Sequence, residues 1–297
     1  LYFPAETEFE GIELWRSDGT AAGTYMIRDH NSFGSSDPAL AAPLPDGGVL
    51  FAAGDSLGTQ FYRLGDDGGF VMLYPDYPSS TARLGDRVFG DLLGPDGNEL
   101  WSTDGTAAGT VQMVDVLPGP ASSNPESLVE QGGHIWFYAR NAASELELWR
   151  TGDAGTTAER LFTLGLRTGL QYSELQPGAS GVYFRLTTLD AGSEPYFSDG
   201  RTTMMLRDVM PGHDSSSPAE FTVAAGKTYF TAYDAVHGRE LWVTDGTAAG
   251  TRVAADIVPG PGSADPIGLY AAWGWLWFDA YDEYGASVPW ALPLAEN

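Results

Sequence analysis

The sequence predicts an all-β protein, a β-propeller built from four-stranded antiparallel blades, and two observations predict it. A long motif, ELWxxDGTxxGT, occurs nearly complete in the segments 13–30, 99–116 and 240–257. Around it, short runs of β-branched and aromatic residues alternate with clusters of Gly, Asp, Asn and Pro, and no stretch has the apolar periodicity of a helix. Many short strands joined by tight turns are typical of a propeller.

Two aromatic positions mark the repeat in every unit. The first is the tryptophan of ELW, or an aromatic in its place, and it recurs every 46–48 residues except for one step of 39. The second is a phenylalanine that precedes the first and shortens at the same step. One unit is therefore used seven times, with a deletion in the second or third copy. The two series are Trp15, Tyr62, Trp101, Trp149, Tyr196, Trp242 and Trp290, and Phe3, Phe51, Phe89, Phe137, Phe184, Phe230 and Phe278.

Each unit is interpreted as four short strands. In the unit that contains 240–257, an aromatic run TYFTAYD leads through a turn to ELWVTD, and DGTAAGT returns the chain onto RVAADI. Four strands about every 45 residues is the size of a propeller blade. We therefore expect a single domain over residues 1–297 with seven blades; six blades with a spare hairpin is the alternative.

The ends of the chain interrupt this regular count. The sequence starts on the second strand of a unit and stops after the third strand of another, which predicts 26 strands. We therefore expect the seam of the ring at the chain termini. Either two incomplete blades meet there, or an upstream segment completes the ring.

The composition excludes several classes of partner. The chain has 40 acidic and 15 basic residues and a formal net charge of −25, so it lacks the basic surface that a nucleic-acid-binding protein needs. Binding to anionic membranes is disfavoured for the same reason, and no segment is apolar enough to insert into a bilayer. There is no cysteine, so the fold depends on its core and its backbone pairing.

The motif, followed by a short strand, an Asp and PGxxSSxP, resembles the bacterial ELWxxDGT repeat family. The resemblance extends periodically along the whole chain, although FYRLGDDGG in the second unit and VPWALPL in the seventh depart from the motif. It implies an exported or surface repeat protein, located outside the cell, on its surface or in the periplasm. It implies no activity and therefore transfers no catalytic residue.

The positions of the motif that recur from repeat to repeat are expected to have structural roles. The aromatic of ELW packs between neighbouring blades, because it recurs at one strand position in every unit. The preceding glutamate faces the other side of the strand or binds a turn amide; these residues are Glu13, Glu99, Glu147, Glu194 and Glu240. The aspartate of DGT shapes a turn in which Gly supplies a positive φ; these residues are Asp18, Asp104, Asp199 and Asp245.

Two groups of residues are candidates for ligand binding. The first is the aspartate at the start of each connection to the next blade, Asp29, Asp115, Asp208 and Asp256, where Ser and Asn follow. By analogy with other propellers these connections lie on the face where ligands bind. The second is the run AAWGWLWFDAYDEY, in which Trp273 and Trp275 offer a stacking surface for a sugar or peptide. Packing at the seam is the alternative for these tryptophans.

A weak calcium site is the one cofactor that the sequence suggests. Asp55, Asp234 and Asp282 each occupy a repeated turn, where one carboxylate and backbone carbonyls can bind Ca²⁺. The alternative is an Asp-capped turn. Zinc is not expected, because the four histidines form no close pair. No nucleophile elbow, P-loop or HExxH motif occurs.

These observations leave three functional hypotheses. The first is a non-enzymatic extracellular or cell-surface scaffold that binds a protein or glycan partner, on a cell surface or in a matrix, through its loop face. The second is a structural surface or filament component that assembles through its open seam, the alternative to a monomer. The third is a hydrolase or lyase with carboxylates around the central channel, since such residues come from different blades and leave no local motif.

Overall fold

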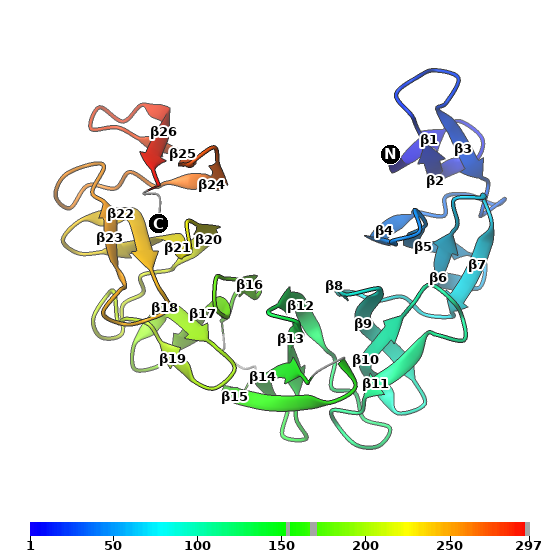
Figure 1. Cartoon of the computed structure of the whole chain (residues 1–297), viewed down its shortest axis with the longest axis horizontal. Helices are drawn as coiled ribbons and strands as arrows, with labels where there is room; N and C mark the ends of the chain where they lie inside the picture. The colour runs from blue at the N-terminus through cyan, green and yellow to red at the C-terminus, as the bar shows by residue number, and fades with distance from the viewer. Residues whose placement is uncertain (153–154, 167–170, 295–297) are drawn as a thin grey trace. The chain divides into compact units, whose positions relative to one another are not determined.

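The computed structural model describes residues 1–152, 155–166 and 171–294, and in these ranges the chain forms 26 β-strands and no α-helix. The prediction of an all-β protein is confirmed. No helix in this part of the chain is long and apolar enough to cross a membrane. The strands form seven antiparallel sheets, in which strands consecutive in sequence lie side by side and are joined by hairpins (Figure 1).

The chain divides into two compact units, which consist of Leu1–Leu128, Tyr138–Asn141 and Thr151–Ala158, and of Val129–Phe137, Ala142–Arg150 and Glu159–Asn297. The first unit contains three whole sheets. Their strands are β1 (Tyr2–Thr7), β2 (Gly11–Arg16) and β3 (Tyr25–Arg28); β4 (Ala39–Pro43), β5 (Val49–Asp55), β6 (Gly58–Leu64) and β7 (Phe70–Tyr74); and β8 (Thr81–Leu84), β9 (Arg87–Gly94), β10 (Gly97–Thr103) and β11 (Val111–Val114).

The second unit also contains three whole sheets. Their strands are β16 (Gln176–Pro177), β17 (Val182–Thr188), β18 (Gly192–Ser198) and β19 (Thr203–Met205); β20 (Ala219–Ala224), β21 (Lys227–Asp234), β22 (Gly238–Thr244) and β23 (Arg252–Ala255); and β24 (Ile267–Ala272), β25 (Trp275–Tyr281) and β26 (Ser287–Pro293). The strands of the remaining sheet are divided between the units; they are β12 (Glu126–Gln131), β13 (His134–Arg140), β14 (Glu145–Thr151) and β15 (Ala158–Leu166).

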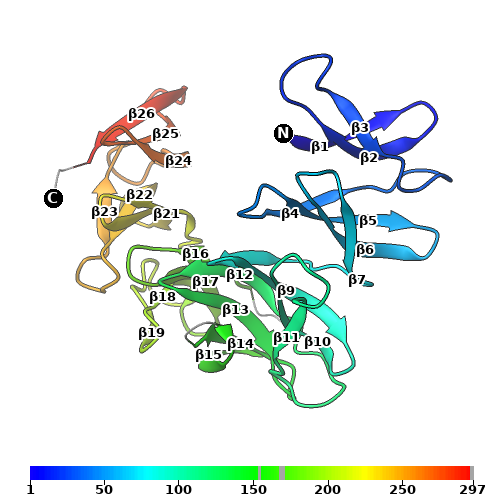
Figure 2. The same cartoon turned by 45° about the vertical axis from the view of Figure 1, so that its right-hand side comes forward.

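The first and the last sheet have three strands, and the other five have four. The first sheet starts on a strand that carries Phe3, the marker of the second strand of a unit, and the last ends on the ELW-type strand with Trp290. This agrees with the 26 strands that the sequence predicts. Figure 2 shows the same meander of hairpins from a second direction.

The two marker positions pair across the central hairpin of a sheet. Phe230 on β21 lies opposite Trp242 on β22, and Phe184 on β17 lies opposite Tyr196 on β18. The third sheet differs, because Trp101 lies opposite Gly90 and not opposite Phe89. Here the hairpin turn has two residues, between the paired Gly94 and Gly97, whereas the turn between β21 and β22 has three; the register therefore shifts by one position.

The motif tryptophans pack between sheets of the same unit, as the sequence predicts. The Trp101 ring is 8% exposed, and its centroid lies 4.7 Å from that of Tyr74 on β7 of the preceding sheet. Trp242 is 2% exposed, and the guanidinium carbon of Arg207 lies 5.6 Å from the centroid of its ring. Burying these two large side chains between sheets contributes to the hydrophobic stabilisation of each unit.

Candidate functional site

The motif glutamates fasten the loops that follow their sheets. Glu99 on β10 is fully buried, and its carboxylate accepts hydrogen bonds from Val116 N at 2.8 Å, Ser123 N at 2.8 Å and Ser123 Oγ at 2.7 Å. Burial raises the pKa of Glu99, while the hydrogen bonds from Ser123 and Val116 act in the opposite direction. The side chain thus ties two points of one loop to the sheet.

The same arrangement recurs in three other sheets. Each carboxylate accepts a bond from the amide of the residue that follows the loop aspartate and from an amide further along the same loop. The partners are His30 and Ser36 for Glu13, Val209 and Ser216 for Glu194, and Ile257 and Ala264 for Glu240. Glu147 instead accepts bonds from Trp149 Nε1, Arg160 and Thr163 Oγ1. Because loop amides occupy four of these carboxylates, and side chains of its own sheet contact that of Glu147, the motif glutamates are structural groups.

The DGT aspartates are turn residues, as predicted. Asp104 Oδ1 accepts hydrogen bonds from Thr106 Oγ1 at 2.7 Å and Thr106 N at 2.9 Å, and these bonds lower the pKa of Asp104. Gly105 has a φ of 87°, which favours glycine. Asp18 and Asp245 repeat this geometry, and Asp199 accepts bonds from the amides of Arg201 and Thr202.

The three aspartates proposed for calcium also cap turns. Asp55 Oδ1 accepts a bond from Leu57 N at 2.7 Å, Asp234 Oδ1 from Val236 N at 2.8 Å, and Asp282 Oδ1 from Tyr284 N at 2.9 Å. No group of three or more His, Asp or Glu side chains placed to hold a metal ion occurs among residues 1–152, 155–166 and 171–294. Calcium binding by these turns stays a prediction. A thermal melt in EDTA against one in millimolar CaCl₂, with an MgCl₂ control, tests it.

The aspartates of the loops between sheets lie in four different loops. Asp29, Asp115, Asp208 and Asp256 each follow the last strand of a different sheet. Asp208 Oδ2 accepts a bond from Gly212 N at 3.4 Å within its own loop, and Asp115 Oδ2 does the same with Gly119 N. A shared ligand site made of these four carboxylates has no support in these contacts, and a role for any one of them stays a prediction.

The predicted aromatic surface lies on the hairpin between β24 and β25. Trp273 is 86% exposed and has a φ of 51°, which is uncommon for a residue with a side chain, and Trp275 is 41% exposed. The Trp275 ring lies 6.5 Å from that of Trp277. Both predicted tryptophans are therefore accessible and close in sequence. Ligand binding by this hairpin stays a prediction.

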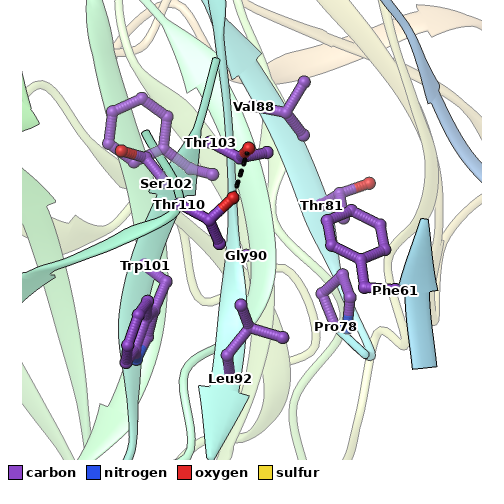
Figure 3. A pocket seen from close by; sticks show the side chains of 11 residues that line it. Phe61, Pro78, Thr81, Val88, Gly90, Leu92, Trp101, Ser102, Thr103 and Thr110 are labelled. Atoms are coloured by element: carbon purple, nitrogen blue, oxygen red, sulfur yellow. Dashed lines mark hydrogen bonds between the residues drawn. The ribbon is translucent and has the colours of Figure 1, made fainter. Parts of the chain in front are cut away.

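A gap beside the motif tryptophan of the third sheet is too small for a ligand. It lies where Trp101, Leu92 and Val88 meet Phe61 of the neighbouring sheet, and its volume is about 10 Å³ (Figure 3). This is about the space of one water molecule. The hydrogen bond between Thr103 Oγ1 and Thr110 Oγ1, 2.8 Å long, closes one side of it. The gap is a packing imperfection between two sheets.

A larger cavity, of about 420 Å³, lies in the second unit between β17 and the strands β16 and β20. A small-molecule or peptide site has a volume of this order. The lining is mostly polar or charged, and it consists of Ser173, Glu174, Gln176, Arg185, Pro218, Ala219, Glu220, Phe221 and Thr222. We take this cavity as the candidate functional site.

Arg185 is the unusual side chain of this cavity. Its backbone is fixed on β17, where Arg185 N donates to Ser173 Oγ at 2.9 Å and Arg185 lies opposite Pro195. Its Nε is buried and has no hydrogen-bond partner. No ion pair links its guanidinium to a carboxylate in the described ranges, although Glu174 and Glu220 line the same cavity. Arg185 as a whole is half-buried, so its guanidinium is available to a ligand, while the buried Nε–H costs free energy as long as it lacks a partner.

Glu220 belongs to the wall of the cavity. It has a φ of 61°, in a bulge of β20 between Ala219 and Thr222. Its Oε2 accepts hydrogen bonds from Gly268 N at 3.1 Å and Leu269 N at 3.4 Å, on β24 of the next sheet. The second residues of β12 and β24, Ser127 and Gly268, have the same left-handed backbone, so this conformation belongs to the repeat, and the carboxylate of Glu220 joins two sheets of one unit.

The sequence analysis did not single out Arg185. A comparison of the repeats could have found it, because equivalent positions can be lined up by strand pairing. In each sheet, one residue of the second strand pairs with the residue that comes directly before the motif aromatic. In the sheets whose pairing is described, this residue is Pro4, Ala52, Asp91, Arg185, Thr231 or Asp279. Arg185 alone among these is basic. A large cation at a position that other repeats fill with small or acidic residues indicates a role beyond the fold.

No protein-family model and no curated protein matches this chain. Among solved structures it is similar to a prolyl endopeptidase from a study of inter-domain dynamics in catalysis and specificity, with a TM-score of 0.54 at 13% identity over 100% of this chain and 49% of the other. It is also similar to prolyl oligopeptidase B from Galerina marginata, with a TM-score of 0.51 at 12% identity, covering 94% of this chain and 47% of the other. The chain thus spans about half the length of these structures.

At this identity the likeness shows the fold alone: antiparallel four-stranded sheets of the kind found in the propeller of prolyl peptidases. It also corrects the first functional hypothesis. The expectation of a non-enzymatic surface scaffold is wrong on this comparison, because the two solved structures named above, which share the fold along most of the chain, are peptidases.

Proposed function

We propose that this chain is the propeller part of a hydrolase that acts on peptides, and that its seven sheets are seven blades of one propeller. The observation that carries the proposal is the match of 100% of this chain to 49% of a prolyl endopeptidase. An exported location, which the repeat resemblance implies, belongs to the same proposal.

The contacts within the chain favour a nucleophile supplied from outside it. The motif glutamates are occupied by loop amides, so they do not provide the channel carboxylates of a hydrolase. His213 Nδ1 contacts Leu189 O and His237 Nδ1 contacts the Asp234 carboxylate, while the ring nitrogens of His30 have no partner. None of these three histidines is bound to a serine or threonine hydroxyl in the manner of a general base. The chain's role is therefore to receive and select the peptide.

The test measures hydrolysis in two samples, the full-length product of the gene and the 297-residue chain. Both are incubated with fluorogenic peptides, including sequences with an internal proline, and with a fluorophosphonate that labels activated serines. We expect hydrolysis and labelling for the full-length product, and peptide binding without hydrolysis for the chain. Absence of hydrolysis by the full-length product across the peptide panel would overturn the proposal. Hydrolysis by the chain alone would move the nucleophile onto the chain.

A further inference from the structure

We infer that the cavity of about 420 Å³ between β17 and β20 binds a carboxylate group of a peptide, with the guanidinium of Arg185 as its partner. The inference takes from the proposed function only that the ligand is a peptide. Recognition of a carboxylate follows from the chemistry of the cavity and stands without hydrolysis.

The first argument is that the fold does not need a cation at this position. The equivalent residues of neighbouring sheets in the same unit are Thr231, which is 2% exposed, and Asp279. A buried threonine and an aspartate support the same pairing without a guanidinium. The five donors of an arginine must be satisfied or solvated when its stem is placed in a strand. Strand pairing therefore does not explain why an arginine occupies this position.

The second argument is the unsatisfied donor. Arg185 Nε is buried without a hydrogen-bond partner. The Nε–H and one Nη–H of arginine form a planar fork that matches the two oxygens of a carboxylate. A bound carboxylate would satisfy this donor and neutralise the charge in one step. Lysine, as a point charge, offers no such fork, which provides a conservative variant for the test.

The third argument concerns the other polar groups of the lining. Ser173 Oγ is engaged by Arg185 N, and Thr222 Oγ1 donates to Glu220 O at 3.0 Å. The amide side chain of Gln176 has no hydrogen bond to a residue in the described part of the chain, so it is a further donor or acceptor for the ligand. A second guanidinium, that of Arg239, donates through Nη1 to Ser217 O at 3.0 Å and pairs with Asp265 at 3.7 Å, so its charge is already compensated. Arg185 is the cation of the lining itself.

The two glutamates of the lining favour a ligand that carries hydrogen-bond donors beside its carboxylate. Glu220 already accepts two backbone bonds, whereas Glu174 is exposed at the rim. With a net charge of −25 on the chain, a small anion such as acetate is repelled over most of the surface. A peptide with amide N–H groups beside its carboxylate suits this mixture of charges. The carboxylate can be the C-terminus of the peptide or an acidic side chain, and the experiment distinguishes the two.

Isothermal titration calorimetry on the chain tests the inference with three matched ligands: acetyl-Ala-Ala with a free C-terminus, the same peptide as an amide, and acetyl-Glu-Ala as an amide. We expect the free acid or the glutamyl peptide to bind at least about tenfold tighter than acetyl-Ala-Ala amide, as for a hydrogen-bonded charge pair. Which of the two binds identifies the source of the carboxylate. Equal affinity for all three peptides would overturn the inference.

Variants assign the binding to Arg185. Arg185→Gln should lose about tenfold or more in affinity for the carboxylate peptide, and Arg185→Lys should recover part of it. Glu174→Gln should tighten binding. Arg83→Gln removes the same charge from an exposed side chain that donates to Gly85 O, and it should leave affinity unchanged. If Arg185→Gln lowered only the thermal midpoint and left carboxylate affinity intact, Arg185 would be structural and the inference would be wrong.

The outcome is separable from that of the proposed function. Carboxylate-selective binding that depends on Arg185, without hydrolysis by the full-length product, would support the inference and reject the hydrolase. Hydrolysis of peptides by the full-length product, with no effect of Arg185→Gln on carboxylate preference, would support the hydrolase and reject the inference.

Discussion

The Glu99 carboxylate accepts hydrogen bonds from both the backbone N and the Oγ of Ser123, a residue 24 positions further along the chain, at 2.8 and 2.7 Å. Between these two residues the chain completes the DGT turn, strand β11 and most of the loop to the next sheet. One buried side chain therefore sets where the loop ends. Glu194 does the same with Ser216, at 3.0 and 2.7 Å, so the relationship is a property of the repeat.

Removing this carboxylate should be costly. Glu99→Ala leaves the partly buried Val116 N and the buried Ser123 N without partners, and we expect the free energy of unfolding to fall by about 3 kcal/mol. Ser123→Ala should cost only about 1 kcal/mol, because its amide still binds Glu99. The chain contains a natural counterpart of the second variant, since Glu240 binds the amide of Ala264. Urea unfolding measures both; an equal loss would show that the hydroxyl dominates the contact.

The second glycine of the DGTAAGT turn should be irreplaceable while the turn aspartate is present. A Cβ added at Gly109 would overlap the carboxylate of Asp104, which is held by Thr106. We expect Gly109→Ala to destabilise the chain by about 2 kcal/mol. In an Asp104→Ala background the same substitution should cost at least about 1 kcal/mol less, because the clash has gone. Additive effects in this double-mutant cycle would exclude the clash.

His30 should make the first unit sensitive to mild acid. Its ring lies 4.7 Å from that of Tyr62 and 5.9 Å from that of Phe70, and both of its nitrogens are buried without partners. Burial, followed by the charge of Arg28, lowers the pKa of His30 from its ordinary 6.5. The folded state resists protonation of His30 more than the unfolded state does. The stability that the neutral ring contributes is therefore complete above pH 6.5 and is lost as the pH falls toward the lowered pKa.

Replacing His30 by Val tests this, because the equivalent loop positions are apolar: Val116, Val209 and Ile257. We expect His30→Val to raise the free energy of unfolding by about 1 kcal/mol at pH 8, with a larger gain at pH 5.5. Thermal or urea unfolding at the two pH values provides the measurement. A gain that does not depend on pH would show that His30 binds its proton equally well in the folded and unfolded states, so that folding does not lower its pKa.

The buried glutamates should make the free energy of unfolding depend on pH in the direction opposite to that expected for His30. Burial raises the pKa of Glu99, Glu194 and Glu240 above the ordinary 4.5. Their contribution is therefore most favourable below pH 4.5 and declines as the pH rises through the raised values. Hydrogen bonds in the DGT turns lower the pKa of Asp104 and Asp245, so stability from these turns is lost below pH 3.8.

With His30→Val as the background, we expect the free energy of unfolding to rise from pH 8 to about pH 5 and to fall below about pH 4. The decrease in net negative charge on acidification acts in the same direction over the upper part of this range. A series of urea unfolding curves at constant ionic strength measures the profile. Stability that increases steadily from pH 5 to pH 8 would mean that the glutamates are more stable charged than buried neutral.

The sequence by itself determined the features that depend on residues close together in the chain. The DGT turn is one of these, since Asp104, Gly105 and Thr106 satisfy each other's geometry within three positions. The period of the aromatic markers, the four strands per unit and the incomplete first and last sheets follow in the same way. Each is a repeated local pattern, and local hydrogen bonds and alternating burial suffice to specify it.

Only the tertiary structure decided the features in which distant residues meet. The partner of Glu99 lies 24 positions away, and the turn length between β9 and β10 places Gly90, not Phe89, opposite Trp101. Arg185 became a candidate because the folded sheets surround a cavity and leave its Nε without a partner. Pairing register and burial arise from contacts between whole strands, so the residue type at one position does not reveal whether its hydrogen bonds are satisfied.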